Sequence, residues 1–240
     1  MSRVAVVTDT TGYLPGELVR AHGIHLVSLY VNFGGERTVR EADITDYDRF
    51  YEELRDADAL PTTSQPAVGD FLAVYEPLLE DGCDILSIHI SAGLSGTCDA
   101  ARQAVETLER GGQNGRVRVF DSATGAGGIA LVALAAAKAA GDGGDLAAVE
   151  AAARSARQSL KIWFAIDTLE YLRRGGRIGA ASATRAMPPA PVAESNTRTR
   201  PSCPPRSSVS TACRAAPHVP ESPAEMWIEM MSQPSSSKGS

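Results

Sequence analysis

The feature that most constrains this chain is the alternation of short apolar runs with longer amphipathic segments between residues 3 and 166. The runs at 3–8, 84–90 and 116–120 are rich in aliphatic residues and bounded by polar ones, as buried strands are. The segments between them carry apolar residues at helical spacing. Strands separated by helices predict an α/β fold with a mostly parallel, doubly wound sheet that is covered on both faces.

The same patterns place the remaining elements. Further strands are predicted over 24–32, 37–40 and 162–166, with a turn at 33–35. Helices are predicted over 14–21, 46–56, 68–79, 97–110, 128–140, 146–160 and 168–173. We expect Phe71, Phe120, Trp163 and Phe164 to lie in the core. In a sheet of this kind, ligands bind beyond the carboxyl ends of the strands.

The composition changes abruptly at residue 184. Residues 184–240 hold 10 of the 14 prolines and no Leu, Phe or Tyr, so they cannot bury enough apolar surface to offset the entropy of ordering. We therefore predict an N-terminal α/β domain over 1–160, the start of a truncated second α/β domain over 161–183, and a disordered Pro/Ser-rich tail over 184–240. In the tail only 224–231 has helical spacing, and a shifted reading frame is one explanation of the change.

Composition also narrows the class of function. The net charge of −6 argues against nucleic-acid binding, which needs clustered Lys and Arg. No apolar run approaches the ~20 residues of a membrane span, and the first strand is too short for a secretory signal. A cytoplasmic protein without stable membrane insertion is expected. The four cysteines, Cys83, Cys98, Cys203 and Cys213, form no CxxC pair, so we expect reduced thiols, no metal and no cofactor.

Three hydroxyl-rich segments stand at predicted strand ends or helix starts, at 8–11, 62–65 and 91–97. For any single Ser or Thr there, a role as a helix cap is the favoured explanation. If the three segments meet at the same end of the sheet, their hydroxyl groups and the nearby helix N-termini form a pocket of hydrogen-bond donors. Such a pocket suits an anion. The glycines at 125–128 are not followed by the GK[ST] of a phosphate loop. A single carboxylate therefore fits better than a phosphate.

A serine-dependent acyl hydrolase is an alternative. The run Gly93-Leu94-Ser95-Gly96-Thr97 falls one residue short of GxSxG, the turn that exposes a nucleophile. The usual chain order would leave only His218, in the tail, as the base, since His89 precedes Ser95 and lies inside a predicted strand. Asp9 is explained as a cap of the first helix or as a hydrogen-bond partner across its loop.

Several long motifs together resemble the DegV family of bacterial fatty-acid-binding proteins over about residues 3–182. They are Thr8-Asp9-Thr10-Thr11-Gly12, Thr62-Thr63-Ser64-Gln65-Pro66, Ser91-Ala92-Gly93-Leu94-Ser95-Gly96-Thr97, Phe120-Asp121-Ser122 and Arg173-Arg174-Gly175-Gly176-Arg177-Ile178-Gly179. The resemblance implies a two-domain α/β protein without catalytic activity. It would carry one long-chain fatty acid, with the carboxylate in a hydroxyl-lined site and the chain in an apolar slot, and would present it to a fatty acid kinase.

Carried over by position, the resemblance makes Thr63, Ser64, Ser91 and Ser95 the ligand-binding residues. Many members have a second serine where this chain has Ala92, and the loss of one such hydrogen bond would weaken binding by about 1–2 kcal/mol. The family continues past the Arg-Ile-Gly motif with a second domain that supplies an arginine and a histidine near the carboxylate. No such continuation is recognisable here, so a truncated, non-functional copy is a further alternative, and weak binding is expected.

Overall fold

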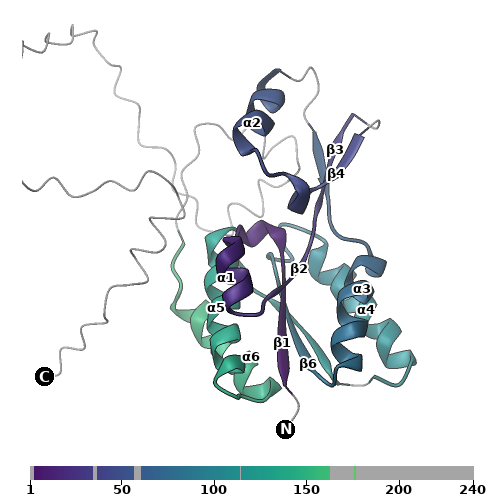
Figure 1. Ribbon diagram of the computed structural model, residues 1–240, viewed down its shortest axis with the longest axis vertical. Coiled ribbons are helices and arrows are strands. Elements are labelled where there is room, and N and C mark those ends of the chain that lie inside the picture. The colour runs from purple at the N-terminus through teal and green to yellow at the C-terminus, as the bar shows by residue number, and fades with distance from the viewer. Residues whose placement is uncertain (1–2, 35–36, 57–60, 114, 163–175, 177–240) are drawn as a thin grey trace, which may run out of the picture. The chain divides into compact units, whose positions relative to one another are not determined.

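The computed structural model describes residues 3–34, 37–56, 61–113, 115–162 and 176 (Figure 1). All of them belong to one compact unit, Met1–Pro189, and a second unit, Ala190–Ser240, lies outside the described residues. The predicted strand at 162–166, apart from Ile162, and the predicted helix at 168–173, with Trp163 and Phe164, also lie outside them. No helix within the described part of the chain is long and apolar enough to cross a membrane.

A four-stranded parallel sheet forms the centre of the fold. Its strands lie side by side in the order β2-β1-β6-β7, and every neighbouring pair is parallel. They are β1 (Val4–Asp9), β2 (His25–Val27), β6 (Asp84–His89) and β7 (Val117–Asp121). The predicted α/β class with a mostly parallel sheet is confirmed.

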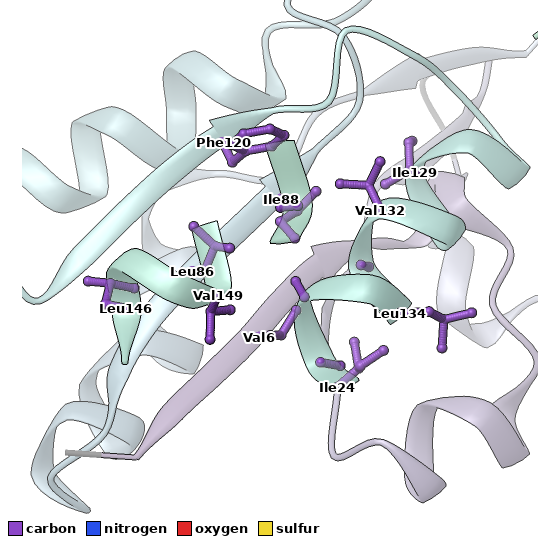
Figure 2. Packing of buried hydrophobic residues seen from close by; sticks show 14 residues of the cluster. Val6, Ile24, Leu86, Ile88, Phe120, Ile129, Val132, Leu134, Leu146 and Val149 are labelled. Carbon is purple, nitrogen blue, oxygen red and sulfur yellow. The ribbon is translucent and has the colours of Figure 1, made fainter. Parts of the chain in front are cut away.

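Helices cover both faces of this sheet, because side chains alternate along each buried strand. Val6, Leu86 and Phe120 pack against α5 and α6 (Figure 2), whereas Val7, Ile85 and Val117 pack against α3 and α4. The helices on the two faces are α5 (Gly127–Gly141) with α6 (Leu146–Ser159), and α3 (Val68–Glu80) with α4 (Thr97–Arg110). Phe71 and Phe120 are buried as predicted.

A second sheet is small and antiparallel. Its order is β4-β3-β5, with β3 (Tyr30–Phe33), β4 (Arg37–Arg40) and β5 (Thr62–Ser64). The remaining elements are the 3₁₀ turns η1 (Thr10–Gly12) and η2 (Glu41–Asp43) and the helices α1 (Gly16–Ala21) and α2 (Tyr47–Asp56). Figure 1 shows β3, β4 and α2 above the carboxyl end of the parallel sheet.

The predicted single strand over 24–32 is wrong, since the chain there forms β2 in one sheet and β3 in the other. Between them the hydroxyl of Ser28 donates to the carbonyl of Leu29 at 2.8 Å and accepts from the backbone N–H of Ala42 at 3.0 Å. The N–H of Leu29 donates to the hydroxyl of Thr10 at 3.2 Å. Side chains thus provide hydrogen-bond partners for the backbone between β2 and β3, where it is paired with neither sheet. The chain can therefore pass from the parallel sheet to the antiparallel one.

Candidate ligand-binding site

A pocket of about 320 Å³ lies between strand β5 and the loop that joins β6 to α4. Its walls combine hydroxyl groups, glycine backbone and two leucines, and none of the described residues that line it carries a charged side chain. The residues that line it are Leu29, Thr63, Ser64, Gln65, Gly93, Leu94, Ser95, Gly96 and Gly176. Three of the four residues proposed as ligands from the sequence, Thr63, Ser64 and Ser95, are therefore brought together.

Each wall of the pocket presents hydroxyl groups in a different way. The hydroxyl of Thr63 has no hydrogen-bond partner among the described residues, and the residue is exposed. The hydroxyl of Ser64 accepts a long bond of 3.4 Å from the amide of Asn32. On the other wall, the hydroxyl of Ser95 is 2.8 Å from that of Thr97 and accepts from the N–H of Thr97 at 3.4 Å. Ser95 thus lies at the N-terminus of α4, the end of a helix that favours negative charge.

Ser91, the fourth predicted ligand, is not among the residues that line the pocket. Its hydroxyl accepts from the N–H of Gly93 at 3.3 Å, and its carbonyl accepts from the N–H groups of Leu94 and Ser95 at 2.8 and 3.1 Å. Its own N–H donates to the carbonyl of Thr124 at 2.9 Å. In this structure Ser91 therefore shapes the turn that carries Ser95.

Gln65 and Gly96 join the two walls. A β-carbon built on Gly96 would lie 3.0 Å from Nε2 of Gln65 and 3.2 Å from its Cδ, so the carboxamide lies against the bare Cα of the glycine. Any larger residue at 96 would push the Gln65 side chain away. Both residues belong to motifs in the sequence, but the sequence assigns a role to neither. The contact between Gln65 and Gly96 joins segments that lie 31 positions apart, and no local pattern indicates it.

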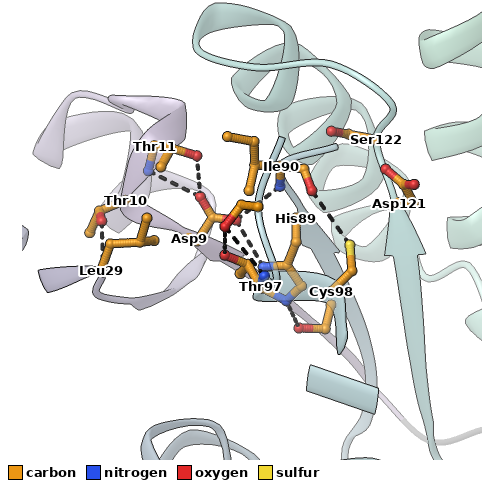
Figure 3. Close-up of polar contacts among 12 residues, drawn as sticks. Asp9, Thr10, Thr11, Leu29, His89, Ile90, Thr97, Cys98, Asp121 and Ser122 are labelled. Atoms are coloured by element: carbon orange, nitrogen blue, oxygen red, sulfur yellow. Dashed lines mark hydrogen bonds and ion pairs between the residues drawn. The ribbon is translucent and has the colours of Figure 1, made fainter. Parts of the chain in front are cut away.

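A chain of four buried polar side chains runs from Tyr75 through Ser87 and His89 to Asp9, and Figure 3 shows its last bond, between His89 and Asp9. The hydroxyl of Tyr75 donates to Oγ of Ser87 at 2.6 Å, and that oxygen is 2.7 Å from Nε2 of His89. Nδ1 of His89 is 3.0 Å from Oδ2 of Asp9. All four residues are essentially inaccessible to solvent. The sequence gives no signal for this network beyond an Asp that follows one predicted strand and a His that lies near the end of another.

The carboxylate of Asp9 is ionised within this network. Burial by itself would raise its pKa, but hydrogen bonds and charge from His89, with donors from Thr11 and Ile90, outweigh burial and hold the pKa of Asp9 below its usual value. Nδ1 of His89 must then carry a proton to donate to Asp9. Asp9 also accepts from Thr11 as the cap of the 3₁₀ turn η1, so the expected bond within its loop occurs. The expected cap of the first helix is wrong, because Pro15 takes the N-cap position of α1 and no described side chain caps that helix.

Ser87, His89 and Asp9 are hydrogen-bonded in the sequence Ser–His–Asp, as in a catalytic triad. Their burial prevents them from acting as one. Substrate cannot reach Ser87, which is fully buried with its oxygen bonded to Tyr75. Both ring nitrogens of His89 are engaged, by Ser87 and Asp9. Within the described residues, Ser95 is hydrogen-bonded to Thr97 rather than to a histidine. The geometry therefore gives Ser95 no general base among these residues.

Comparison with known proteins identifies the family. Residues 3–186 match the family model described as "Uncharacterised protein, DegV family". The chain is 36% identical over 183 residues to Protein DegV of Bacillus subtilis, which covers 75% of this chain and 63% of the relative. The chain belongs to the DegV family. It spans a little under two thirds of the length of that relative.

Solved structures of DegV proteins agree in fold. One from Thermus thermophilus, described as binding fatty acid, is 36% identical with a TM-score of 0.65 and covers 75% of this chain and 62% of its own. A stearic acid-binding protein from Eubacterium ventriosum is 27% identical with a TM-score of 0.64 and covers 75% and 61%. The resemblance to this family inferred from the sequence is thus confirmed for the part of the chain that matches.

Proposed function

We propose that this DegV-family chain is a carrier, not an enzyme, that binds one long-chain fatty acid with its carboxylate in the pocket between β5 and the β6–α4 loop. The observation that supports this most directly is the meeting of Thr63, Ser64 and Ser95 around one cavity of about 320 Å³. Ligand pockets of small molecules begin at about this size. The fatty-acid binding of the Thermus and Eubacterium relatives supports the same ligand class.

The chemistry of the pocket suits a carboxylate. Hydroxyl groups on two walls, the N-terminus of α4 and the Gln65 amide offer neutral donors, and the part of the lining that the structure describes holds no acidic side chain that would repel the anion. Leu29 and Leu94 supply apolar surface beside these donors. Neutral donors hold a carboxylate weakly in water, at about 1 kcal/mol for each bond, so most of the affinity must come from the buried methylenes of the ligand, at about 0.8 kcal/mol each.

The 240-residue chain is expected to bind more weakly than its longer relatives. The family match ends at residue 186, and the match to the Bacillus subtilis protein covers 63% of that relative, so the matched part offers less surface against which an acyl chain can be buried. We expect an affinity at least tenfold lower than that of Bacillus subtilis DegV, because a loss of about 1.4 kcal/mol, or two exposed methylenes, already gives a factor of ten.

The carrier is further proposed to present its fatty acid to a fatty acid kinase, which would phosphorylate the bound carboxylate. The openness of the site supports this step, since Thr63 and Gln65 are both exposed and leave one side of the cavity accessible to a partner. Because a kinase works where ATP is available, the proposal places the carrier in the cytoplasm.

Isothermal titration with stearate below its micelle concentration tests the proposal. Thr63→Val combined with Ser95→Ala removes two hydroxyls with little change of shape and should weaken binding by about 2 kcal/mol, near thirtyfold. Thr62→Val is the matched control, because Thr62 is exposed on the same strand and does not line the pocket. Equal affinity in the double variant and the control would refute the site, and no binding by the unmodified chain would indicate a non-functional copy.

A further inference from the structure

Two adjacent residues at the carboxyl end of β1 are bonded to segments that form the pocket or lead into it. The hydroxyl of Thr10 accepts from the N–H of Leu29 at 3.2 Å, and Leu29 lines the pocket. Oδ2 of Asp9 accepts from the N–H of Ile90 at 3.0 Å, and Ile90 begins the segment that leads to Ser95. Figure 3 shows both bonds, together with those that tie Asp9 to Thr11 and His89.

The segment from Ile90 to Ser95 is held at its start by hydrogen bonds from three sides. Asp9 accepts from the N–H of Ile90, and the thiol of Cys98 is 3.5 Å from the carbonyl of Ile90. Ser91 then donates to the carbonyl of Thr124, and its own carbonyl accepts from the N–H of Ser95 at 3.1 Å. The position of the Ser95 hydroxyl is therefore fixed through a short series of bonds that starts at Asp9.

Only a carboxylate can satisfy the groups that surround residue 9. Oδ1 accepts from both the N–H and the hydroxyl of Thr11, and Oδ2 accepts from Nδ1 of His89 and from the N–H of Ile90 at 3.0 Å each. An asparagine has one acceptor oxygen, so its NH₂ group would face donors in either orientation. Since Asp9 is 1% exposed, water cannot replace the lost acceptor, and the neighbouring backbone must move.

We propose that Asp9 is a positioning residue for the carboxylate pocket: without touching the ligand, its side chain sets the place of the Ile90–Ser95 segment and, with Thr10, that of Leu29. The inference rests on the proposed function for its ligand. His89 is bonded to Asp9 directly, and Ser87 and Tyr75 are bonded to His89 in turn. In this proposal the role of the buried network is to fix the orientation of the Asp9 carboxylate.

Asp9→Asn tests this proposal, with Asp84→Asn as the matched control. Asp84 begins β6, the strand next to β1, and so lies at the amino ends of the strands, opposite to the end that carries Asp9. Its carboxylate forms an ion pair with Arg116 at 3.1 Å. Each variant removes one negative charge, from the buried carboxylate of Asp9 or from the half-buried carboxylate of Asp84. The readout is the ratio of affinities for laurate and 1-dodecanol, because general destabilisation lowers both affinities together, whereas a displaced carboxylate site lowers only the first. We expect the ratio to fall about tenfold in Asp9→Asn and to stay unchanged in Asp84→Asn.

Amide hydrogen exchange of the ligand-free protein gives a second readout that needs no ligand. In Asp9→Asn the N–H groups of Leu94 and Ser95, both bonded to the Ser91 carbonyl, should exchange at least tenfold faster, with no such change in Asp84→Asn. If Asp9→Asn does not fold, Thr11→Val removes one donor to the same carboxylate and should shift the same amides in the same direction by less.

The outcomes separate the two proposals. An unchanged laurate preference and unchanged exchange at 94 and 95 in Asp9→Asn would overturn the positioning role while leaving the carrier function in place. Failure of the unmodified protein to prefer laurate over dodecanol would overturn the carrier function, and the exchange comparison would still decide whether Asp9 orders the segment. Loss of preference with faster exchange supports both.

Discussion

Replacement of Gly128 by alanine should destabilise the fold, although the same change in most helices stabilises it. Gly128 is the second residue of α5 and is buried. A β-carbon there would lie 2.2 Å from Cδ1 of Ile162 and 2.4 Å from Oγ1 of Thr124. Ile162 can move the end of its side chain, since the residue is half-buried. Thr124 cannot, because it is short, branched at Cβ and only 7% exposed.

The expected magnitude follows from two opposed effects. Overpacking of a buried site costs about 1–3 kcal/mol, whereas alanine gains about 0.4–1 kcal/mol over glycine by restricting the unfolded chain. The net loss is about 1–2 kcal/mol, or a fall in Tm of about 2–8 °C for a protein of this size. Because the carbonyl of Thr124 accepts from the N–H of Ser91, displacement of Thr124 should also weaken fatty-acid binding.

Gly69→Ala is the matched control. Gly69 is also the second residue of its helix, α3, but nothing lies within 4 Å of the β-carbon that alanine would add. Urea unfolding should show Gly69→Ala as stable as the unmodified protein or more so, and Gly128→Ala less stable at an unchanged m value. If the two variants were equally stable, contact at Thr124 would not govern the effect and the reasoning would be wrong.

Three further outcomes follow from the buried polar groups. Tyr75→Phe should lower the free energy of unfolding by about 1–2 kcal/mol in urea titration, because Ser87 loses a donor where water cannot enter; no measurable loss would contradict this. The folded-state pKa of Asp9 is depressed below its usual value of about 4, so its stabilisation is present above the unfolded value and lost as the pH falls through the folded value. The stability gap between the unmodified protein and Asp9→Asn should therefore narrow as the pH falls below about 4 in acid titration. Burial raises the pKa of the Cys98 thiol to about 12, so iodoacetamide at about pH 8 should label this cysteine only after unfolding, as read by peptide mass spectrometry.

Most of the parallel sheet and its helices could be predicted, because their signals are local. The helix predicted over 97–110 coincides with α4, and those predicted over 68–79 and 128–140 end within one residue of α3 and α5. Apolar residues repeat at strand or helix spacing in these segments, and the pattern needs no knowledge of distant partners. The helix predicted over 14–21 begins later, at Gly16, because Pro15 takes the cap position instead of the first turn.

Strand β5 of the second sheet could not be predicted, for the opposite reason. Residues 62–64 are polar, and their sequence indicates only a segment before a helix, yet they form β5 by pairing with β3, with Thr63 opposite Val31. The pairing partner lies about thirty residues away in the chain, and a strand of three residues carries almost no periodicity of its own. The hairpin of β3 and β4 was foreseen, since its turn is local.

The candidate site shows the same division between what single motifs reveal and what only the fold reveals. Thr63 and Ser95 could be proposed because each stands in a recognisable hydroxyl-rich motif, and the structure brings both to one cavity. The bond between Asp9 and His89 spans 80 positions, and no spacing in the sequence indicates it. The sequence instead raised the question of a histidine base for Ser95.

Burial decides what these polar residues can do. Ser87, His89 and Asp9 have the residue types and the contacts of a hydrolytic triad, but complete burial removes the access that catalysis requires and converts the same bonds into a fixed support. Ser95 and Thr63 keep access to a cavity but have neither a base nor a charged partner among the residues that line it. Among the described residues, the accessible hydroxyls can donate hydrogen bonds to a carboxylate, which is the chemistry that the proposed carrier function requires.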